Sequence, residues 1–192
     1  MAEWHLNHRA ATAGRSLPAL RGVFEVTEID NVSRYILRGG EPAIAALSSA
    51  LGVALEQPIN QVSTSEVCSA LHVGPNEWLL LVELNRSQDF ISRLRNAAGD
   101  RPYALVDVSH RNVGLHLHGS GVGDALASGC PQNLDDAAFP IGKCTRTVYA
   151  KTGIFLWRRD ENDFVLETWR SFVPYLLDYL TQETALLFAD RT

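Results

Sequence analysis

The feature that most constrains the fold of this chain is an internal repeat. Short segments of the first half return in the second half in the same order, about 80 to 86 residues later. That spacing is too long for a solenoid repeat and fits a duplicated α+β unit. The matching segments are 29–32 with 110–113, 37–39 with 117–119, 46–47 with 125–126, 76–80 with 162–166, and 86–87 with 170–171. We therefore expect an α+β domain of two pseudo-symmetric halves, each with antiparallel strands and packed helices in the order strand–strand–helix–strand–strand–helix.

Turn and capping signals place the elements of the first half, residues 23–100. The dipeptide Asp30-Asn31 between two alternating apolar segments predicts a β-hairpin. Pro42 is typical of the first turn of a helix, and Gly52 is typical of a helix end. The predicted elements are strands at 24–29, 32–38, 66–73 and 78–84, and helices at 41–51 and 87–98.

The second half, residues 101–192, shows the same signals. Asp124 follows a glycine-rich turn and is predicted to begin a short helix. Ser171 is predicted to cap the C-terminal helix, with Pro174 in its first turn. The predicted strands are one that runs from Asp107 through His110 to a tight turn at Arg111-Asn112, and three more at 112–118, 146–157 and 164–169.

Residues 1–22 have no sustained hydrophobic period and are predicted to be a lead-in to the fold. They are either a frayed tail or an arm whose Trp4 docks on a partner, since Trp is enriched among interface anchors. Residues 23–192 are then a single domain made of the two halves 23–100 and 101–192.

Composition excludes several classes of function. The 46% hydrophobic share is that of an ordinary globular protein, and the formal net charge of −5 argues against nucleic-acid or anionic-membrane binding. No apolar run approaches the ~20 residues of a membrane span. The three cysteines lack a C-x-x-C spacing, so we expect reduced, structural thiols in a soluble cytoplasmic protein.

Two segments resemble catalytic or cofactor motifs. The glycine-rich segment 119–123 lies between a strand and a helix, but a dinucleotide fingerprint needs glycine where Asp124 stands. Asp107, Ser109 and His110 have the residue types of a hydrolase triad, but on an extended strand His110 points away from the other two. We therefore predict no catalytic and no cofactor-binding residues in this chain.

The remaining candidates are a histidine pair and a basic-aromatic cluster. His116 and His118 share one strand face at a spacing compatible with two metal ligands, but no third ligand is placed beside them. We predict no metal site and expect this face to meet solvent or a partner. The basic-aromatic cluster near the last hairpin consists of Trp157, Arg158, Arg159, Trp169 and Arg170. It is either an ordinary solvated turn or an interface hot spot, for which Arg and Trp are preferred. The interface candidates are Trp4, His110, Arg111, His116, His118, Arg158, Trp169 and Arg170.

Several stretches, in the right order, cover nearly everything after the lead-in and resemble the gamma subunit family of heterotetrameric sarcosine oxidase. They are 73–80 (VGPNEWLL), 107–114 (DVSHRNVG), 129–131 (GCP), 139–147 (FPIGKCTRT) and 164–174 (FVLETWRSFVP). That family resembles the folate-binding domain of the glycine-cleavage T-protein, whose D-x-S-H strand and small-residue helix match residues 107–127. The chain departs from the T-protein at 149–155 (YAKTGIF), a shortened stretch without the carboxylate that works at the folate site there.

The resemblance implies a non-catalytic, structural subunit of an oxidoreductase. The assembled enzyme would convert sarcosine to glycine with hydrogen peroxide and pass the one-carbon unit to tetrahydrofolate. The partners implied are the alpha, beta and delta subunits, with alpha as the direct contact. FAD, FMN, NAD, tetrahydrofolate and zinc are expected in those partner subunits, and none in this chain.

Two other functions remain open from the sequence. One is a free-standing folate-dependent one-carbon transfer protein of the T-protein superfamily, which would bind tetrahydrofolate as an isolated chain. The other is a non-enzymatic assembly factor unrelated to sarcosine, which would associate with proteins that lack flavin.

Overall fold

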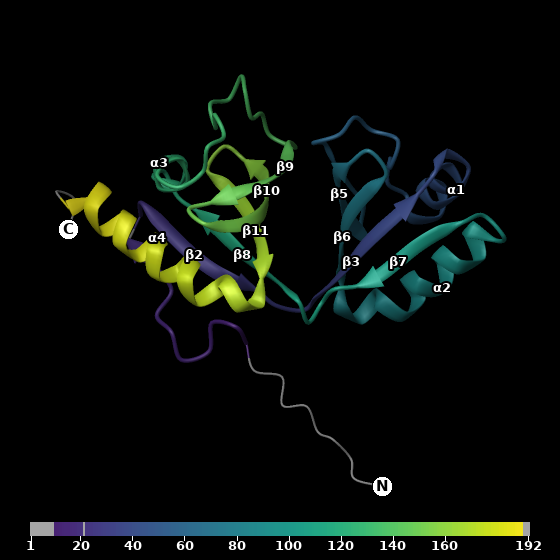
Figure 1. The fold of residues 1–192 in the computed structure, drawn as a ribbon, viewed down its shortest axis with the longest axis horizontal. Helices are drawn as coiled ribbons and strands as arrows, with labels where there is room; N and C mark the ends of the chain where they lie inside the picture. Colours follow the sequence, from purple (N-terminus) through teal and green to yellow (C-terminus); the bar gives the residue numbers. More distant parts are fainter. Residues whose placement is uncertain (1–9, 21, 190–192) are drawn as a thin grey trace, which may run out of the picture.

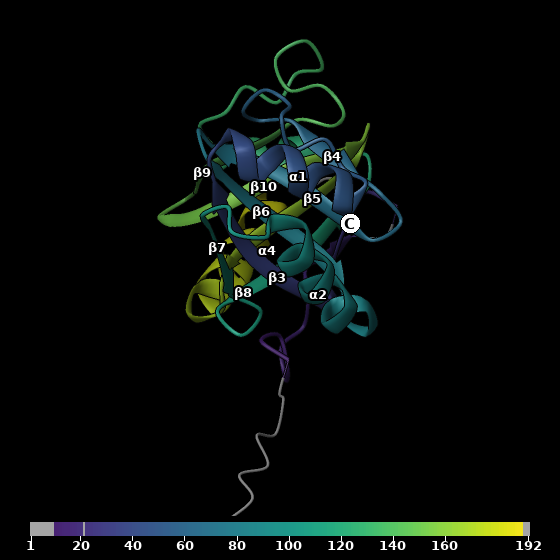
Figure 2. The same ribbon diagram turned by 90° about the vertical axis from the view of Figure 1, so that its right-hand side faces the viewer.

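The structure is a computed structural model that describes residues 10–20 and 22–189. Two antiparallel sheets form two lobes, and each lobe carries its helices on the outside (Figure 1). From the side, the two lobes lie one behind the other (Figure 2). The predicted fold class, α+β with two similar halves of antiparallel strands and packed helices, is confirmed.

The strands divide between the two sheets. Among the described residues, the six-stranded sheet has the order β1-β2-β8-β11-β10-β9 and the five-stranded sheet has the order β4-β5-β6-β3-β7. The first sheet contains β1 (Ala19–Leu20), β2 (Phe24–Ile29), β8 (Asn112–His118), β9 (Cys144–Tyr149), β10 (Thr152–Asp160) and β11 (Asp163–Trp169). The second contains β3 (Val32–Gly39), β4 (Val62–Thr64), β5 (Cys68–Gly74), β6 (Glu77–Glu83) and β7 (Tyr103–Asp107).

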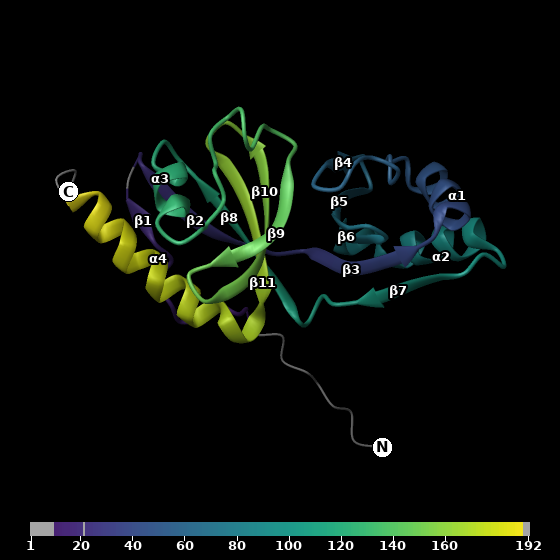
Figure 3. The same cartoon turned by 45° about the horizontal axis from the view of Figure 1, so that its top comes forward.

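The two halves exchange their first strands. β2 pairs with β8 in the six-stranded sheet, while β7 pairs with β3 in the five-stranded sheet (Figure 3). The predicted hairpin at Asp30-Asn31 is therefore wrong, because the chain crosses there from one sheet to the other. β3 is a central strand with buried residues on both faces, and its neighbours are β6 and β7. The local turn signal marks the change of direction correctly but does not choose the partner strand.

The helices cover the outer faces of the sheets. α1 (Glu41–Leu51) and α2 (Ser87–Ala98) pack on the five-stranded sheet, and α3 (Val122–Ala127) and α4 (Val173–Leu187) pack on the six-stranded sheet. In α2, Phe90 and Leu94 lie one turn apart and are buried, as an amphipathic helix requires. α1 ends at Gly52, whose φ of 65° is the left-handed conformation that glycine tolerates best.

Four predicted boundaries are wrong. The strand predicted from Asp107 through His110 ends at Asp107, and Ser109 and His110 lie in the turn that follows it. The predicted strand at 146–157 is two strands, β9 and β10, joined by a tight turn in which Ala150 has a φ of 51°. No glycine or asparagine marks that turn, and a hydrogen bond from the Ala150 amide to the Gly129 carbonyl, at 2.8 Å, holds it. α3 begins before Asp124, and α4 follows a 3-10 turn with Phe172, not Ser171, at its N-cap.

Part of the lead-in packs on the domain. β1 pairs with β2, and the carboxylate of Glu28 accepts hydrogen bonds from the backbone amides of Ala11 and Thr12 at 3.2 and 3.1 Å. Arg15 also forms an ion pair with Asp178 on α4 at 3.0 Å. Trp4 lies outside the described residues, and the predicted domain boundaries stay a prediction.

Candidate functional site: a groove between the two sheets

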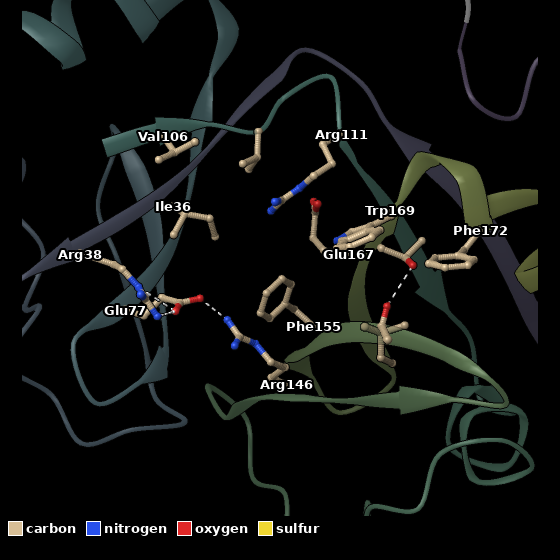
Figure 4. Close-up of a pocket in the computed structure, with 14 residues that line it drawn as sticks. Ile36, Arg38, Glu77, Val106, Arg111, Arg146, Phe155, Glu167, Trp169 and Phe172 are labelled. Carbon is tan, nitrogen blue, oxygen red and sulfur yellow. Dashed lines mark hydrogen bonds and ion pairs between the residues drawn. The ribbon is translucent and has the colours of Figure 1, made fainter. Parts of the chain in front are cut away.

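A groove of about 690 Å³ lies between the two sheets. One wall comes from β3, β6 and β7, and the other from β9, β10 and β11 with the turn before α4 (Figure 4). Its apolar lining is mixed with arginine and glutamate side chains. The residues that line it include Ile36, Arg38, Glu77, Val106, Arg111, Arg146, Phe155, Glu167, Trp169 and Phe172.

At one side of the groove a carboxylate joins the two walls. Glu77 on β6 pairs with Arg38 on the neighbouring strand, with Arg38 Nε 3.0 Å from its Oε2, and with Arg146 from the opposite sheet. Burial raises the pKa of Glu77, but the hydrogen bonds and positive charges of Arg38 and Arg146 outweigh burial. The pKa therefore lies below its ordinary value of 4.5, so Glu77 is an anion at neutral pH.

A second carboxylate lies at the floor of the groove. Glu167 on β11 is completely buried and accepts hydrogen bonds from Nε of Arg34 on β3. Burial raises the pKa of Glu167 above its ordinary value of 4.5, and the charge and hydrogen bonds of Arg34 oppose that shift. Gly114 makes room for this pair, since a Cβ there would collide with the carboxylate and stand 2.7 Å from Arg34 Nη2.

The other end of the groove is aromatic. Trp169 and Phe172 stack with ring centroids 6.0 Å apart and are 50% and 40% exposed. The Arg111 guanidinium lies 5.5 Å from the centroid of the Trp169 ring, within cation–π range. Its Nε donates to Asn112 Oδ1 at 3.1 Å. The groove therefore combines an exposed aromatic surface with an arginine whose described partners are uncharged.

Comparison with known proteins decides the family. A model of the sarcosine oxidase gamma subunit family matches residues 38–186. The chain belongs to this family. The sarcosine oxidase subunit gamma of Corynebacterium sp. (strain P-1) is 28% identical over 162 residues, covering 83% of this chain and 79% of that protein.

A solved structure agrees with this family. A chain of heterotetrameric sarcosine oxidase from Corynebacterium sp. U-96, in complex with pyrrole 2-carboxylate, superposes with a TM-score of 0.80 and 25% identity, over 88% of both chains. Aminomethyltransferase T of the glycine cleavage system from Bartonella henselae superposes with a TM-score of 0.62 and 15% identity, over 83% of this chain and 46% of that one. The second match shows a shared fold, as expected from the resemblance to the T-protein.

The prediction that Arg158 belongs to an exposed interface cluster requires a correction. Its side chain is buried, and its guanidinium donates to the carbonyl oxygens of Phe139 at 3.0 Å and Glu161 at 2.8 Å. It also pairs with Asp136 at 2.6 Å. Arg158 therefore ties the loop before β9 to the last hairpin and is not available as a surface contact.

The histidine pair lies on β8 with acidic partners. His116 Nε2 is 2.8 Å from Asp163 Oδ2, and His118 Nε2 is 3.5 Å from Glu25 Oε2. The two imidazole rings stack with centroids 5.0 Å apart. Across the described part of the chain, no group of three or more His, Cys, Asp or Glu residues could hold a metal ion.

The motif around Asp107 has a structural role at the strand crossing. The Ser109 hydroxyl accepts a hydrogen bond from the Arg34 amide at 2.9 Å, and Asp107 accepts one from the Ser109 amide at 2.8 Å. His110 is exposed next to them, and the Arg170 amide donates to the Arg111 carbonyl at 2.7 Å. Of the interface candidates that the structure describes, only Arg111 and Trp169 line the groove.

The glycine-rich segment serves close packing. A Cβ at Gly119 would meet the Val23 carbonyl, and a Cβ at Gly121 would meet the Phe188 ring at 2.6 Å. These glycines therefore let the turn before α3 approach the start of β2 and the end of α4.

Sequence reasoning missed the charged residues that lie between the two sheets. They are Arg38, Glu77, Arg146 and Glu167, which line the groove, and Arg34, which pairs with Glu167. The available signal was a charged residue between apolar residues of a strand, as with Arg34 in VSRYILRG and Glu167 in DFVLETW. Such a residue is normally assigned to the solvent face. Here the sheet face that points away from the helices packs against the other sheet and not against solvent.

Proposed function

We propose that this chain acts as a non-catalytic, structural gamma subunit in a heterotetrameric sarcosine oxidase. In that assembly it supports the alpha subunit, while the enzyme oxidises sarcosine to glycine with hydrogen peroxide and passes the one-carbon unit to tetrahydrofolate. The family match over residues 38–186 supports the assignment to this oxidoreductase.

The observation that carries the structural role is how the groove holds its carboxylates. Glu77 is bridged by two guanidinium groups, and Glu167 is completely buried against a third. A general acid or base needs a carboxylate that can reach a substrate and exchange a proton near the working pH. Both glutamates instead tie one sheet to the other, so the groove chemistry supports a stabilising role.

The remaining assignments follow from this proposal. The alpha subunit is the direct contact, and the beta and delta subunits complete the assembly. FAD, FMN, NAD, tetrahydrofolate and zinc are held by those partners. The whole complex is cytoplasmic. Among the described helices, none is long and apolar enough to cross a membrane.

Co-expression of the tagged chain with candidate alpha, beta and delta subunits tests the proposal. We expect three further chains to co-purify, with flavin absorbance and sarcosine-dependent hydrogen peroxide formation. A colourless protein that purifies alone would overturn the proposal. Titration of that lone protein with tetrahydrofolate would then separate a folate-dependent transfer protein from a non-enzymatic assembly factor.

A further inference from the structure

The groove carries more positive charge than its own carboxylates neutralise. Arg38 and Arg146 share the single carboxylate of Glu77, while Glu167 forms an ion pair with Arg34. Arg111 has uncharged partners within the described residues, the Asn112 side chain and the Trp169 ring. The groove is therefore locally cationic in a chain whose formal net charge is −5. A cationic cleft favours an anionic occupant, because opposite potentials attract across an interface.

The same groove exposes apolar surface beside its unneutralised arginine. Trp169 and Phe172 form a stacked pair, and Val106 on the opposite wall is 54% exposed. Contiguous exposed apolar surface marks interaction sites, and Trp and Arg dominate interface hot spots. In Figure 4 the Arg111 and Trp169 side chains lie beside one another on the same side of the groove. An occupant that suits both needs a negative charge next to an apolar group.

A second copy of this chain is a poor occupant. A symmetric dimer through the groove would place the same patch against itself, so the cationic clusters would face each other. Like charges brought together at an interface are unfavourable. Trp169 and Phe172 are also partly exposed, so the groove is open to solvent on that side. An open groove suits an extended chain segment that lies along it.

We propose that the groove binds a segment of a partner subunit that carries a carboxylate beside an aromatic or aliphatic side chain. The carboxylate pairs with Arg111, and the apolar side chain packs on Trp169 and Phe172. This inference rests on the proposed function, since it names the surface through which the gamma subunit joins its assembly. Arg111 and Trp169 are the anchors, because Arg111 supplies the unneutralised charge and Trp169 supplies the larger of the two exposed rings in the groove.

Crosslinking within the assembled enzyme tests the position of the partner. A photo-crosslinking amino acid replaces Val106 in the groove. In the control variant it replaces Leu186, which is 75% exposed on α4. Position 106 should crosslink to a peptide of a partner subunit with an acidic residue next to an apolar one. Crosslinks to a second copy of this chain, to a small anion only, or to no partner would overturn the inference.

Exchange kinetics test the anchors. Complexes containing Arg111→Glu or Trp169→Ala are mixed with isotope-labelled wild-type chain, and the replacement of the variant is followed by mass. Loss of a hot-spot residue should speed dissociation about 30-fold. The controls Arg93→Glu and Leu186→Ala, both on exposed helix positions, should exchange like wild type.

Failure of the groove as a docking surface and failure of the proposed function give different results. Groove variants that exchange like the controls, in a complex that forms and oxidises sarcosine, would overturn the groove as the docking surface and leave the proposed function intact. A wild-type chain that never joins flavin-containing partners would overturn the function and this inference together. The crosslinking arm keeps the first result decisive even if one anchor variant is unstable.

Discussion

Arg34 on β3 and Glu167 on β11 form a buried ion pair that joins the two sheets. Nε of Arg34 lies 2.9 and 2.7 Å from the two carboxylate oxygens. The same guanidinium donates to the carbonyl oxygens of Val32 at 2.9 Å and Ile29 at 3.2 Å. Ile29 ends the exchanged strand β2 and Val32 begins β3. One side chain therefore holds both the sheet contact and the strand crossing.

Breaking this pair on one side should be costly. Arg34→Met leaves the Glu167 carboxylate buried without its partner, and we expect a loss of about 3–5 kcal/mol in the free energy of unfolding. Urea denaturation measures it. The double variant with Glu167→Leu should recover part of the loss, because no buried charge remains. The exposed pair of Asp89 and Arg93 is the control, and its removal should have no measurable effect.

That prediction fails if the single and double variants are equally unstable. Such a result would mean that packing, and not the uncompensated charge, dominates the cost at this position.

Gly114 should be intolerant of even a methyl group. A Cβ there would stand 2.7 Å from Arg34 Nη2, so Gly114→Ala must displace the ion pair, and we expect a loss of about 1–3 kcal/mol in the free energy of unfolding. Gly153→Ala is the matched control, because nothing lies within 4 Å of a Cβ at that strand position. Equal stability of the two variants in thermal or urea unfolding would contradict the close packing at Gly114.

The Glu77 bridge should make stability depend on pH on the acidic side. Its pKa is lowered in the folded protein, so its contribution is fully present above the unfolded pKa, near 4.5, and is lost as pH falls through the folded value. Glu77→Gln should therefore flatten the fall in stability on acidification below about pH 4.5. Unfolding curves of both proteins from neutral pH downward measure this. An unchanged acid slope in the variant would show that the bridge contributes nothing.

The three cysteines should be unreactive in the native protein. Burial raises the pKa of Cys68 to about 11 and that of Cys144 to about 12, and it also raises the pKa of the Cys130 thiol. Because the thiolate is the reactive form, thiol reagents at mildly alkaline pH should label these residues only as the chain unfolds. Mass spectrometry with and without urea checks this. Rapid native labelling at any of the three would contradict the structure there.

Local signals made several elements predictable from the sequence. The helix predicted at 87–98 is α2 with the same bounds, because its apolar spacing is regular and tertiary contacts do not override it. The end of α1 at Gly52 followed from the conformational freedom of glycine. The internal repeat predicted two similar halves, since a duplicated sequence must bury the same faces twice.

The strand exchange could not be predicted in this way. The alternation in β2 shows that Phe24 and Val26 face a core, but either neighbouring strand would satisfy that pattern. The partner of Arg34 lies 133 residues further along the chain, so only the folded topology reveals it. For the same reason the local sequence places Arg158 in an exposed turn, whereas a loop whose path that sequence does not determine covers it in the structure.

The structural role is tested most directly by comparing the enzyme assembled with and without this chain. The measurement is sarcosine turnover per bound flavin, together with the half-life of that activity on warming. We expect equal turnover per flavin and a shorter half-life without the chain, because a bound subunit stabilises its partners by mass action. Loss of turnover while the flavins and other subunits remain assembled, or an unchanged half-life, would contradict it.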